Sequence, residues 1–169
     1  AMNLGGDGLG GASEKRRLGG VVRGMTDILP ENRPRHLLGI SEPDDIFAAV
    51  ENGVDTFDCV SPTRVARNAA VYSHRGRFNI VQSRFRRDLS PIEEGCDCYT
   101  CTHYSRAYLH HLCKAREMDA STLASIHNER FIVRLVDEIR TSIEDGRFDE
   151  FREETLGAYY ATARSEGRK

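Results

Sequence analysis

Three of the chain's five cysteines lie within six residues, as Cys96, Cys98 and Cys101 of the segment CDCYTC. The spacing C-x-C-x2-C lets one short loop direct three thiolates at a single ion. Three core or surface cysteines that meet by chance are the alternative, but such clustering is rare in a chain with so few cysteines. Because structural zinc is tetrahedral, the segment predicts a zinc site that takes its fourth ligand from elsewhere in the chain.

The fourth ligand is expected among the histidines. His103 lies too close to the cysteine loop to close the site comfortably from its far side, while His110 and His111 fall on the helix predicted next. His127 lies 26 residues after Cys101, on a second predicted helix that an antiparallel hairpin could return to the cysteines. The spacing alone leaves the choice open. With four protein ligands the ion has no free coordination position, so the site is predicted to be structural.

Asp58 is the carboxylate best placed for catalysis, because it falls near the carboxyl end of a strand predicted within the segment GVDTFDCV. Carboxylates are depleted in strands and costly to bury without a partner. In α/β barrels the catalytic residues lie at such strand ends, where an aspartate can attack an anomeric carbon. A carboxylate that merely caps a turn is the alternative, and a turn role is expected for Asp55.

Basic residues gather in one part of a chain whose net charge is only −2. Residues 64–87 contain no acid and seven arginines: Arg64, Arg67, Arg75, Arg77, Arg84, Arg86 and Arg87. A local basic segment in a nearly neutral protein indicates a local contact with a polyanion, and a solvated face is the alternative. Arg64 and Arg67 could hold phosphates, since a guanidinium presents a planar fork of donors. Surface solvation or an ion pair with a nearby acid would explain them equally.

A strand, a helix and a second strand are expected to position Asp58. Residues 35–40 and 54–60 read as short buried strands. Between them a helix is predicted, with Ser41 as its N-cap and Gly53 at its end. Short connections make this a βαβ unit with parallel strands. Since one such unit does not form a stable parallel sheet, we expect the chain to be the end of a larger α/β fold.

The remaining sequence is predicted to be largely helical. The longest helix should bury a stripe of apolar side chains: Leu123, Ile126, Val133, Val136 and Ile139 or Ile143. The predicted elements are a weak helix at 14–27, a hairpin of 69–74 and 77–82, and helices at 103–118, 121–143 and 147–169.

The composition is that of one soluble globular domain, with 169 residues, 39% hydrophobic and 30% charged. No apolar run approaches the roughly 18 residues that a membrane span requires, and the first residues lack the apolar core of a secretory signal. We therefore expect a cytoplasmic protein without a membrane partner, whose cysteines bind metal or stay free. Cys59 and Cys113 are expected to be small buried apolar residues.

Four segments together resemble one protein family. GVDTFDCVSPTRVARN, CDCYTC, YSRAYLHH and IHNERF occur in the order found in the C-terminal part of bacterial-type tRNA-guanine transglycosylase, also called queuine tRNA-ribosyltransferase. The resemblance covers about residues 9–145, and its motifs are long and specific. It implies the C-terminal part of an irregular (β/α)8 TIM barrel with a zinc-binding helical subdomain. The implied domains are barrel strands and helices in 1–92, the zinc subdomain and closing helices in 93–145, and a helical tail in 146–169.

The resemblance also implies an activity, that of a pentosyltransferase. Members of the family exchange guanine at the wobble position of tRNAs with a GUN anticodon for a 7-deazaguanine such as preQ1, in queuosine biosynthesis. Asp58 matches the nucleophile that forms a covalent bond to the ribose, and Arg64 and Arg67 match tRNA-binding arginines. The implied zinc ligands are Cys96, Cys98, Cys101 and His127. The resemblance assigns base recognition to Gly10, Gly11 and Ala12, in a segment one residue shorter than the family's commonest spacing.

A homodimer is implied for the full-length enzyme, through the helix that carries Tyr104, Tyr108 and His111. Full-length members are much longer than this chain and carry a second catalytic aspartate in the part that precedes the matching segment. We therefore expect a truncated product, a fragment or a partial chain that is inactive alone. The first alternative is a non-catalytic, zinc-stabilised module for tRNA binding or dimerisation, which has no use for Asp58. A catalytically silent subunit of a heterodimer is the second alternative.

Overall fold

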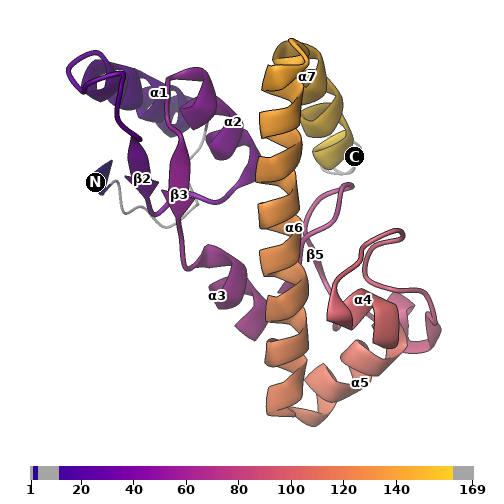
Figure 1. Ribbon diagram of the computed structural model, residues 1–169. Helices are drawn as coiled ribbons and strands as arrows, with labels where there is room; N and C mark the ends of the chain where they lie inside the picture. Colours follow the sequence, from indigo (N-terminus) through magenta and orange to yellow (C-terminus); the bar gives the residue numbers. More distant parts are fainter. Residues whose placement is uncertain (1, 4–11, 162–169) are drawn as a thin grey trace. The chain divides into compact units, whose positions relative to one another are not determined.

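The computed structural model describes residues 2–3 and 12–161, and side chains from residue 19 to 161. The chain forms two compact units, Ala1–Ser61 and Pro62–Lys169. The first unit contains a parallel sheet with two helices, and the second is mostly helical (Figure 1). The overall class is therefore α/β, as predicted. The predicted domain limits at residues 92 and 145 stay predictions.

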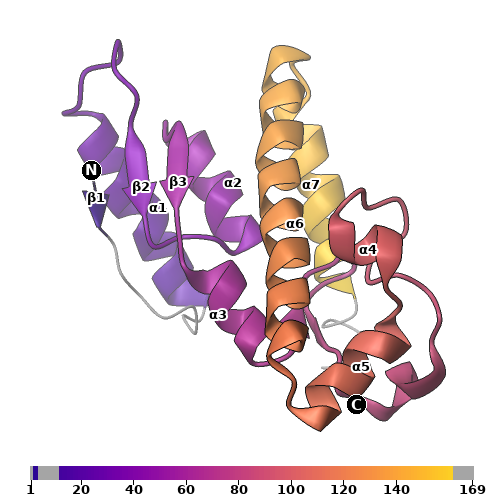
Figure 2. The ribbon, with the colours of Figure 1, turned by 60° about the horizontal axis from the view of Figure 1, so that its bottom comes forward.

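The first unit contains the predicted βαβ arrangement. Its elements are β1 (Met2–Asn3), α1 (Ala12–Thr26), β2 (His36–Leu38), α2 (Pro43–Glu51) and β3 (Thr56–Asp58). The sheet has the order β1-β2-β3 and all pairs are parallel, with Leu38 opposite Asp58. Helices α1 and α2 lie together on one side of β2 and β3 (Figures 1 and 2). Strand β1 was not predicted, since its two residues carry no periodic apolar pattern.

A small apolar core joins the helices of this unit to its sheet. Its fully or nearly fully buried members come from both helices, one strand and the connecting segments: Val22, Leu37, Ile40, Ala49 and Val54. Helix α1 forms as predicted despite its glycines, and α2 ends before Gly53, whose φ of 87° suits a residue without Cβ.

Ser41 is not the N-cap of α2, and this prediction was wrong. The cap is Glu42, and Pro43 occupies the first helical turn. Proline is pre-organised for that position and therefore fixes the helix start one residue later than Ser41 requires. The Ser41 hydroxyl is instead buried, and no described residue bonds to it. Asp44 and Asp45 occupy the first turn, where negative charge is favourable.

The second unit is built around one long helix, α6 (Met118–Glu144), shown in orange in Figure 1. Helices α4 and α5 pack beside its first half and α7 beside its second half (Figures 1 and 2). The other elements are α3 (Ser61–Arg67), β4 (Ala70–Val71), β5 (Phe78–Asn79), the 3-10 helix η1 (Ser83–Arg87), α4 (Tyr99–His103), α5 (Arg106–Ala115) and α7 (Phe148–Tyr159). Strands β4 and β5 form the predicted antiparallel hairpin.

The core of the second unit collects apolar side chains from five elements and two loops: Ala66, Val71, Ile80, Phe85, Ile92, Leu109 and Ala124. The helix predicted at 103–118 starts later, at Arg106, because Ser105 is the N-cap of α5 and its hydroxyl accepts from the Tyr108 N–H. Among the described residues, no helix combines the length and apolar character that a membrane span needs.

The buried face of α6 differs in part from the predicted stripe. Leu123 and Ile139 are buried as predicted, but Ile126 and Val133 are 37% and 52% exposed. The face that is buried consists of Ala120, Leu123, Ala124, His127, Asn128, Phe131, Leu135, Ile139 and Ser142. Two polar residues occupy central positions of this face. A search for apolar periodicity passes over them and shifts the stripe to neighbouring apolar positions.

Candidate metal centre

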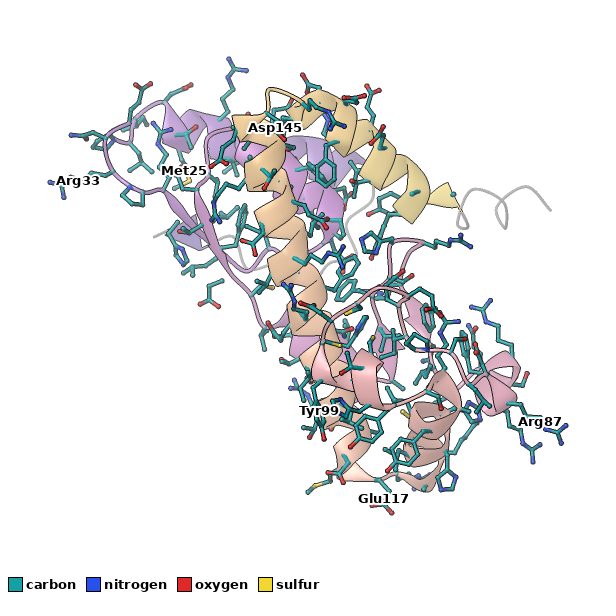
Figure 3. The ribbon with its side chains drawn as sticks, turned by 45° about the vertical axis from the view of Figure 1, so that its right-hand side comes forward. Met25, Arg33, Arg87, Tyr99, Glu117 and Asp145 are labelled. Carbon is teal, nitrogen blue, oxygen red and sulfur yellow. The ribbon has the colours of Figure 1, made fainter. Side chains whose placement is uncertain are left out.

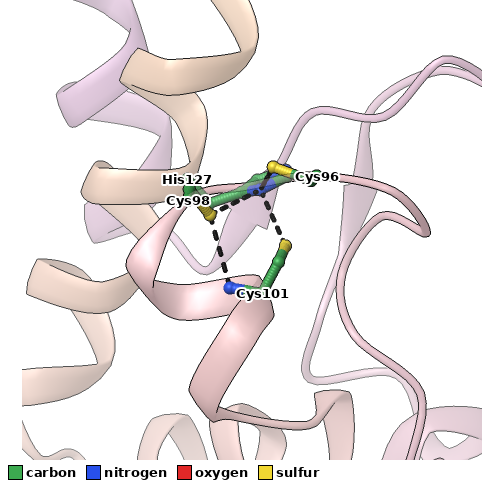
Figure 4. Close-up of side chains that lie close together, drawn as sticks. All are labelled: Cys96, Cys98, Cys101 and His127. Carbon is green, nitrogen blue, oxygen red and sulfur yellow. Dashed lines mark hydrogen bonds between the residues drawn. The ribbon is translucent and has the colours of Figure 1, made fainter.

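The structure gathers four potential metal ligands at one point of the second unit. They are Cys96, Cys98, Cys101 and His127, whose ligand atoms all lie within 4.8 Å of one another. Figure 4 shows the three sulfurs around the imidazole. The His127 Nδ1 atom lies 3.8 Å, 3.7 Å and 3.3 Å from the sulfurs of Cys96, Cys98 and Cys101. The four side chains could therefore hold one metal ion.

These distances fit a tetrahedral ion. Zinc–sulfur bonds of about 2.3 Å and zinc–nitrogen bonds of about 2.0–2.1 Å place the sulfur and nitrogen atoms about 3.6 Å apart at tetrahedral angles. The three measured separations bracket this value. Three thiolates and one imidazole are also a donor set typical of structural zinc. The residues present thus fit the ion that the sequence predicts.

The cysteine loop is fixed to α6 by polar contacts on both sides of Cys98. Asp97 accepts two hydrogen bonds from the Arg130 guanidinium, at 2.7 Å and 2.9 Å. The buried Thr100 hydroxyl donates to the Leu123 carbonyl at 2.6 Å. Cys98 is itself the N-cap of α4, and its sulfur accepts from the Cys101 N–H. Because the loop is attached at several points, the sulfurs are held together by the fold as well as by any ion.

His127 is oriented by the backbone of the residue after β4. Its Nε2–H donates to the Tyr72 carbonyl at 2.8 Å, and the His127 ring is fully buried. That bond directs Nε2 away from the cluster, so Nδ1 is the ring nitrogen that faces the sulfurs. A second-sphere hydrogen bond of this kind is what metal-binding histidines usually have.

Asn128 is the next residue of α6, and it holds the same backbone segment from the other side. Its Oδ1 accepts from the Tyr72 N–H at 3.0 Å, while its Nδ2 donates to the carbonyls of Pro62 and Ala70, both at 3.0 Å. Asn128 and Tyr72 are both fully buried. The consecutive side chains of His127 and Asn128 therefore form hydrogen bonds to the carbonyl and the N–H of Tyr72. Asn128 also joins α6 to both α3 and β4.

Hydrogen bonds within the cluster shift pKa values in opposite directions. The bond between Cys98 and Cys101 lowers the pKa of Cys98 to about 4 and raises the pKa of Cys101, so one thiol donates to the other thiolate. Burial lowers the pKa of His127, but its bonds to Cys96, Cys98 and the Tyr72 carbonyl outweigh burial and raise the pKa to about 9. A metal ion entering this site must displace these shared protons.

The other histidines considered for the site lie elsewhere. His103 is exposed and its Nδ1 atom contacts the Tyr99 carbonyl, while His110 is buried against the Ile80 carbonyl at 3.0 Å. His111 is exposed on α5. Cys59 and Cys113 also stay outside the cluster and are half-buried free thiols. Burial raises the pKa of Cys113, as expected for a small residue within a core.

Asp58 ends β3 and its side chain is exposed. Its backbone carbonyl accepts from the Gly39 N–H at 2.7 Å, and no described side chain forms an ion pair with its carboxylate. Asp55 has the predicted turn role, since its carboxylate accepts from the Arg35 N–H at 2.7 Å. Of these two aspartates, the one without an ion pair to a described side chain is the one predicted to act in catalysis.

Arg64 and Arg67 lie exposed on α3 in the second unit. Gly10 and Gly11 lie outside the described residues, and so does the side chain of Ala12, whose backbone starts α1. Three residues that support the cluster were not predicted from the sequence: Asn128, Asp97 and Arg130. A charged residue between two ligand cysteines is a signal that could have found Asp97, whereas no local pattern in the sequence points to Asn128 or Arg130.

The family model described as queuine tRNA-ribosyltransferase matches residues 1–161. The chain belongs to this family. Curated proteins with the same name include one from Symbiobacterium thermophilum, which is 44% identical over 164 residues covering 95% of this chain. A relative from Dehalococcoides mccartyi is 50% identical over 142 residues, and one from Caldanaerobacter subterraneus subsp. tengcongensis is 47% identical over 140 residues, covering 84% and 83% of this chain.

The queuine tRNA-ribosyltransferase relatives are considerably longer than the chain. The aligned segment is 41% of the Symbiobacterium protein, 36% of the Dehalococcoides protein and 37% of the Caldanaerobacter protein. The chain thus spans about two fifths of the length of the relatives it matches.

Proposed function

We propose that this chain supplies the C-terminal part of a tRNA-guanine transglycosylase, with Asp58 as its nucleophile. The observation that carries the proposal is the Cys3His cluster, whose four members occupy the positions that the family resemblance assigns to zinc. On this proposal the sheet of the first unit belongs to a (β/α)8 barrel. Its parallel strands and the covering helices α1 and α2 are compatible with that fold.

Asp58 has the exposure and the strand position that a nucleophile needs. An ionised carboxylate oxygen attacks C1′ of the ribose at the wobble guanosine, and the bond from C1′ to the guanine leaves with its electron pair on the base. A 7-deazaguanine then attacks C1′ from the opposite side through its N9, releases the carboxylate and gives up its N9 proton, while the departed guanine takes up a proton. Each step forms one bond to C1′ and breaks one, so the exchange needs no energy source and retains the configuration. Asp58 lies at the carboxyl edge of a parallel sheet, where barrel enzymes place such groups.

The Cys3His cluster has a structural role in this proposal. When bound, zinc supplies a fourfold cross-link between the cysteine loop and α6, with no position left for substrate. Through the neighbouring Asn128 the same part of α6 holds α3, which carries Arg64 and Arg67. We assign these two arginines to the phosphates of the tRNA anticodon region, and Gly10, Gly11 and Ala12 to recognition of the base.

The same proposal includes the substrates, which are a tRNA with a GUN anticodon and preQ1 as the incoming base. It also includes a cytoplasmic location and a homodimeric enzyme. The homodimer surface would include the stacked rings of Tyr104 and Tyr108, whose centroids lie 5.1 Å apart. Tyr108 is 43% exposed. An exposed aromatic stack of this kind is typical of protein interfaces.

A chimera tests the catalytic proposal. This chain replaces the matching segment of the Symbiobacterium thermophilum relative, and the chimera is incubated with a tRNA anticodon stem-loop. The unchanged chimera should form a covalent protein–RNA complex that is stable to denaturant. The Asp58→Asn variant of the chimera should not form this complex. The matched control Asp55→Asn removes a carboxylate from the same sheet and should keep the complex. Metal content should not change in either variant.

A surviving complex in Asp58→Asn would assign the nucleophile to another residue. The second candidate function is a non-catalytic metal-stabilised module. One observation favours it: all four cluster residues and both arginines of α3 belong to the second unit, whereas Asp58 belongs to the first. That function predicts RNA binding without any covalent complex in the unchanged chimera.

A further inference from the structure

The 3-10 helix η1 presents three exposed arginines on a firmly anchored turn. Arg84, Arg86 and Arg87 are exposed, whereas Phe85 between them is only 5% exposed. The Phe85 ring lies 4.9 Å from the Phe78 ring within the core of the second unit. In a 3-10 helix, residues three apart lie on the same side, so Arg84 and Arg87 share one edge of η1. Figure 3 shows the Arg87 side chain extending outward at the periphery of this unit.

Six other arginines of the second unit have an acidic partner that these three lack among the described residues. No ion pair joins Arg84, Arg86 or Arg87 to a carboxylate of the residues that the structure describes, and a different set of arginines in the same unit does have such pairs. The paired arginines are Arg106, Arg130, Arg134, Arg140, Arg147 and Arg152.

The acid next to the cluster is already engaged. The Asp88 carboxylate accepts from Arg106 at 3.0 Å and from the backbone N–H of Ser90 at 3.0 Å, and also from the Ser90 hydroxyl. Arg106 donates further to the Ile92 carbonyl at 2.8 Å. This network leaves Asp88 little capacity to neutralise η1. Three cations therefore gather on one short helix, and an anion from outside would relieve their mutual repulsion.

We propose that Arg84, Arg86 and Arg87 form a phosphate-binding surface for the RNA backbone, separate from Arg64 and Arg67 on α3. The choice of RNA rests on the proposed function. The net charge of −2 shows that the cluster is not a by-product of a generally basic chain. Guanidinium groups match phosphate oxygens in geometry and charge.

The arginine surface of η1 is expected to recognise the charge of the RNA backbone and not the base sequence. Phe85 is the aromatic residue of η1, and because its ring is packed in the core it has no free face on which a base could stack. The Arg84 guanidinium lies over that ring, 4.6 Å from its centroid, which further fixes the turn. Contacts of arginine to phosphate position a nucleic acid without selecting its bases. The surface is therefore expected to bind RNA strands of different sequence equally well.

The experiment compares two double variants of this chain that lose the same charge. Arg86→Gln/Arg87→Gln removes unpaired arginines, and Arg140→Gln/Arg147→Gln removes two that are exposed and paired with Asp137 and Glu150. Binding of a labelled RNA stem-loop is measured by fluorescence anisotropy over a range of salt concentrations. The η1 variant should weaken binding about tenfold at moderate salt and reduce the slope of log K against log salt by about 1.5, since each phosphate contact contributes about 0.7–0.9.

The paired control should stay close to the unchanged chain in both affinity and slope. Equal losses in the two variants would attribute binding to net charge and overturn the proposal, as would an η1 variant that binds RNA normally. Anionic phosphatidylserine vesicles are tested alongside, and a loss confined to vesicles would assign the surface to membranes instead. The result is separable from the catalytic proposal, because an absent covalent complex at Asp58 leaves the salt dependence of RNA binding unaffected.

Discussion

The two units hold their candidate functional residues in different ways. In the second unit, the cysteine loop and α6 bring the cluster together, and Tyr72, Asn128 and Arg130 support it from within the same unit. In the first unit, Asp58 ends a three-residue strand whose side chains are exposed or half-buried. Parallel strands are normally buried on both faces. The metal centre is thus complete within one unit, whereas the carboxylate site depends on whatever covers the sheet.

The largest effect is expected from removing a ligand of the metal centre. His127→Ala should abolish stoichiometric metal binding and destabilise the second unit by several kcal/mol, because metal binding energy contributes directly to folding at such sites. Metal content by mass spectrometry and thermal unfolding measure the two effects. Cys113→Ala is the matched control. Cys113 lies on α5 outside the cluster, so this variant protein should keep its metal. Full metal occupancy in His127→Ala would show that the cluster is not the binding site.

Asn128→Ala should have the next largest effect. It leaves the Tyr72 N–H and the carbonyls of Pro62 and Ala70 without their partner in a buried place. Buried unsatisfied groups cost about 1–3 kcal/mol each, so the loss of three such bonds should lower the unfolding free energy by at least about 3 kcal/mol in denaturant titration. Asn68→Ala serves as control, because within the described part of the chain the exposed Asn68 side chain bonds only the Arg64 carbonyl, one turn earlier. Comparable losses in both variants would contradict the role assigned to Asn128.

Low pH should reduce the unfolding free energy of the second unit, in part because Asp88 becomes protonated. Hydrogen bonds from Ser90 and the Arg106 guanidinium hold the pKa of Asp88 below its ordinary value of 3.8. A lowered folded-state pKa means that the stabilisation is fully present above about pH 3.8 and is lost as the pH falls through the folded-state value. Asp88→Asn should therefore flatten the decline in unfolding free energy at acid pH. Ser90→Ala should shift the decline to higher pH, and an unchanged acid profile in both variants would remove Asp88 from this explanation.

The smallest effect is expected at the exposed pair of Arg140 and Asp137. The two side chains are 63% and 58% exposed, and such pairs contribute about 0.5 kcal/mol or less. Asp137→Asn should leave the midpoint of thermal unfolding nearly unchanged. The midpoint of Asn128→Ala, measured under the same conditions, serves as the comparison. A large loss would mean that the surface of α6 supports this unit more than its buried face does.

Local patterns predicted much of this structure. The βαβ unit follows from apolar runs and helix-end signals, and the cysteine loop is visible from its spacing alone. The buried face of α6 was predicted less well, because His127 and Asn128 occupy core positions that apolar periodicity skips. Spacing also left the fourth ligand open, since the sequence does not show which histidine the long helix returns to the cysteines. Asn128 could not be assigned from sequence, as its partners lie 56 to 66 residues away.

The central claim is that Cys96, Cys98, Cys101 and His127 enclose one zinc ion completely. Zinc K-edge X-ray absorption on the purified chain tests it most directly. We expect three sulfur ligands at about 2.3 Å and one nitrogen ligand at about 2.0 Å, with no oxygen from water. A spectrum with two sulfurs, or with an oxygen in the first coordination sphere, would contradict the closed site.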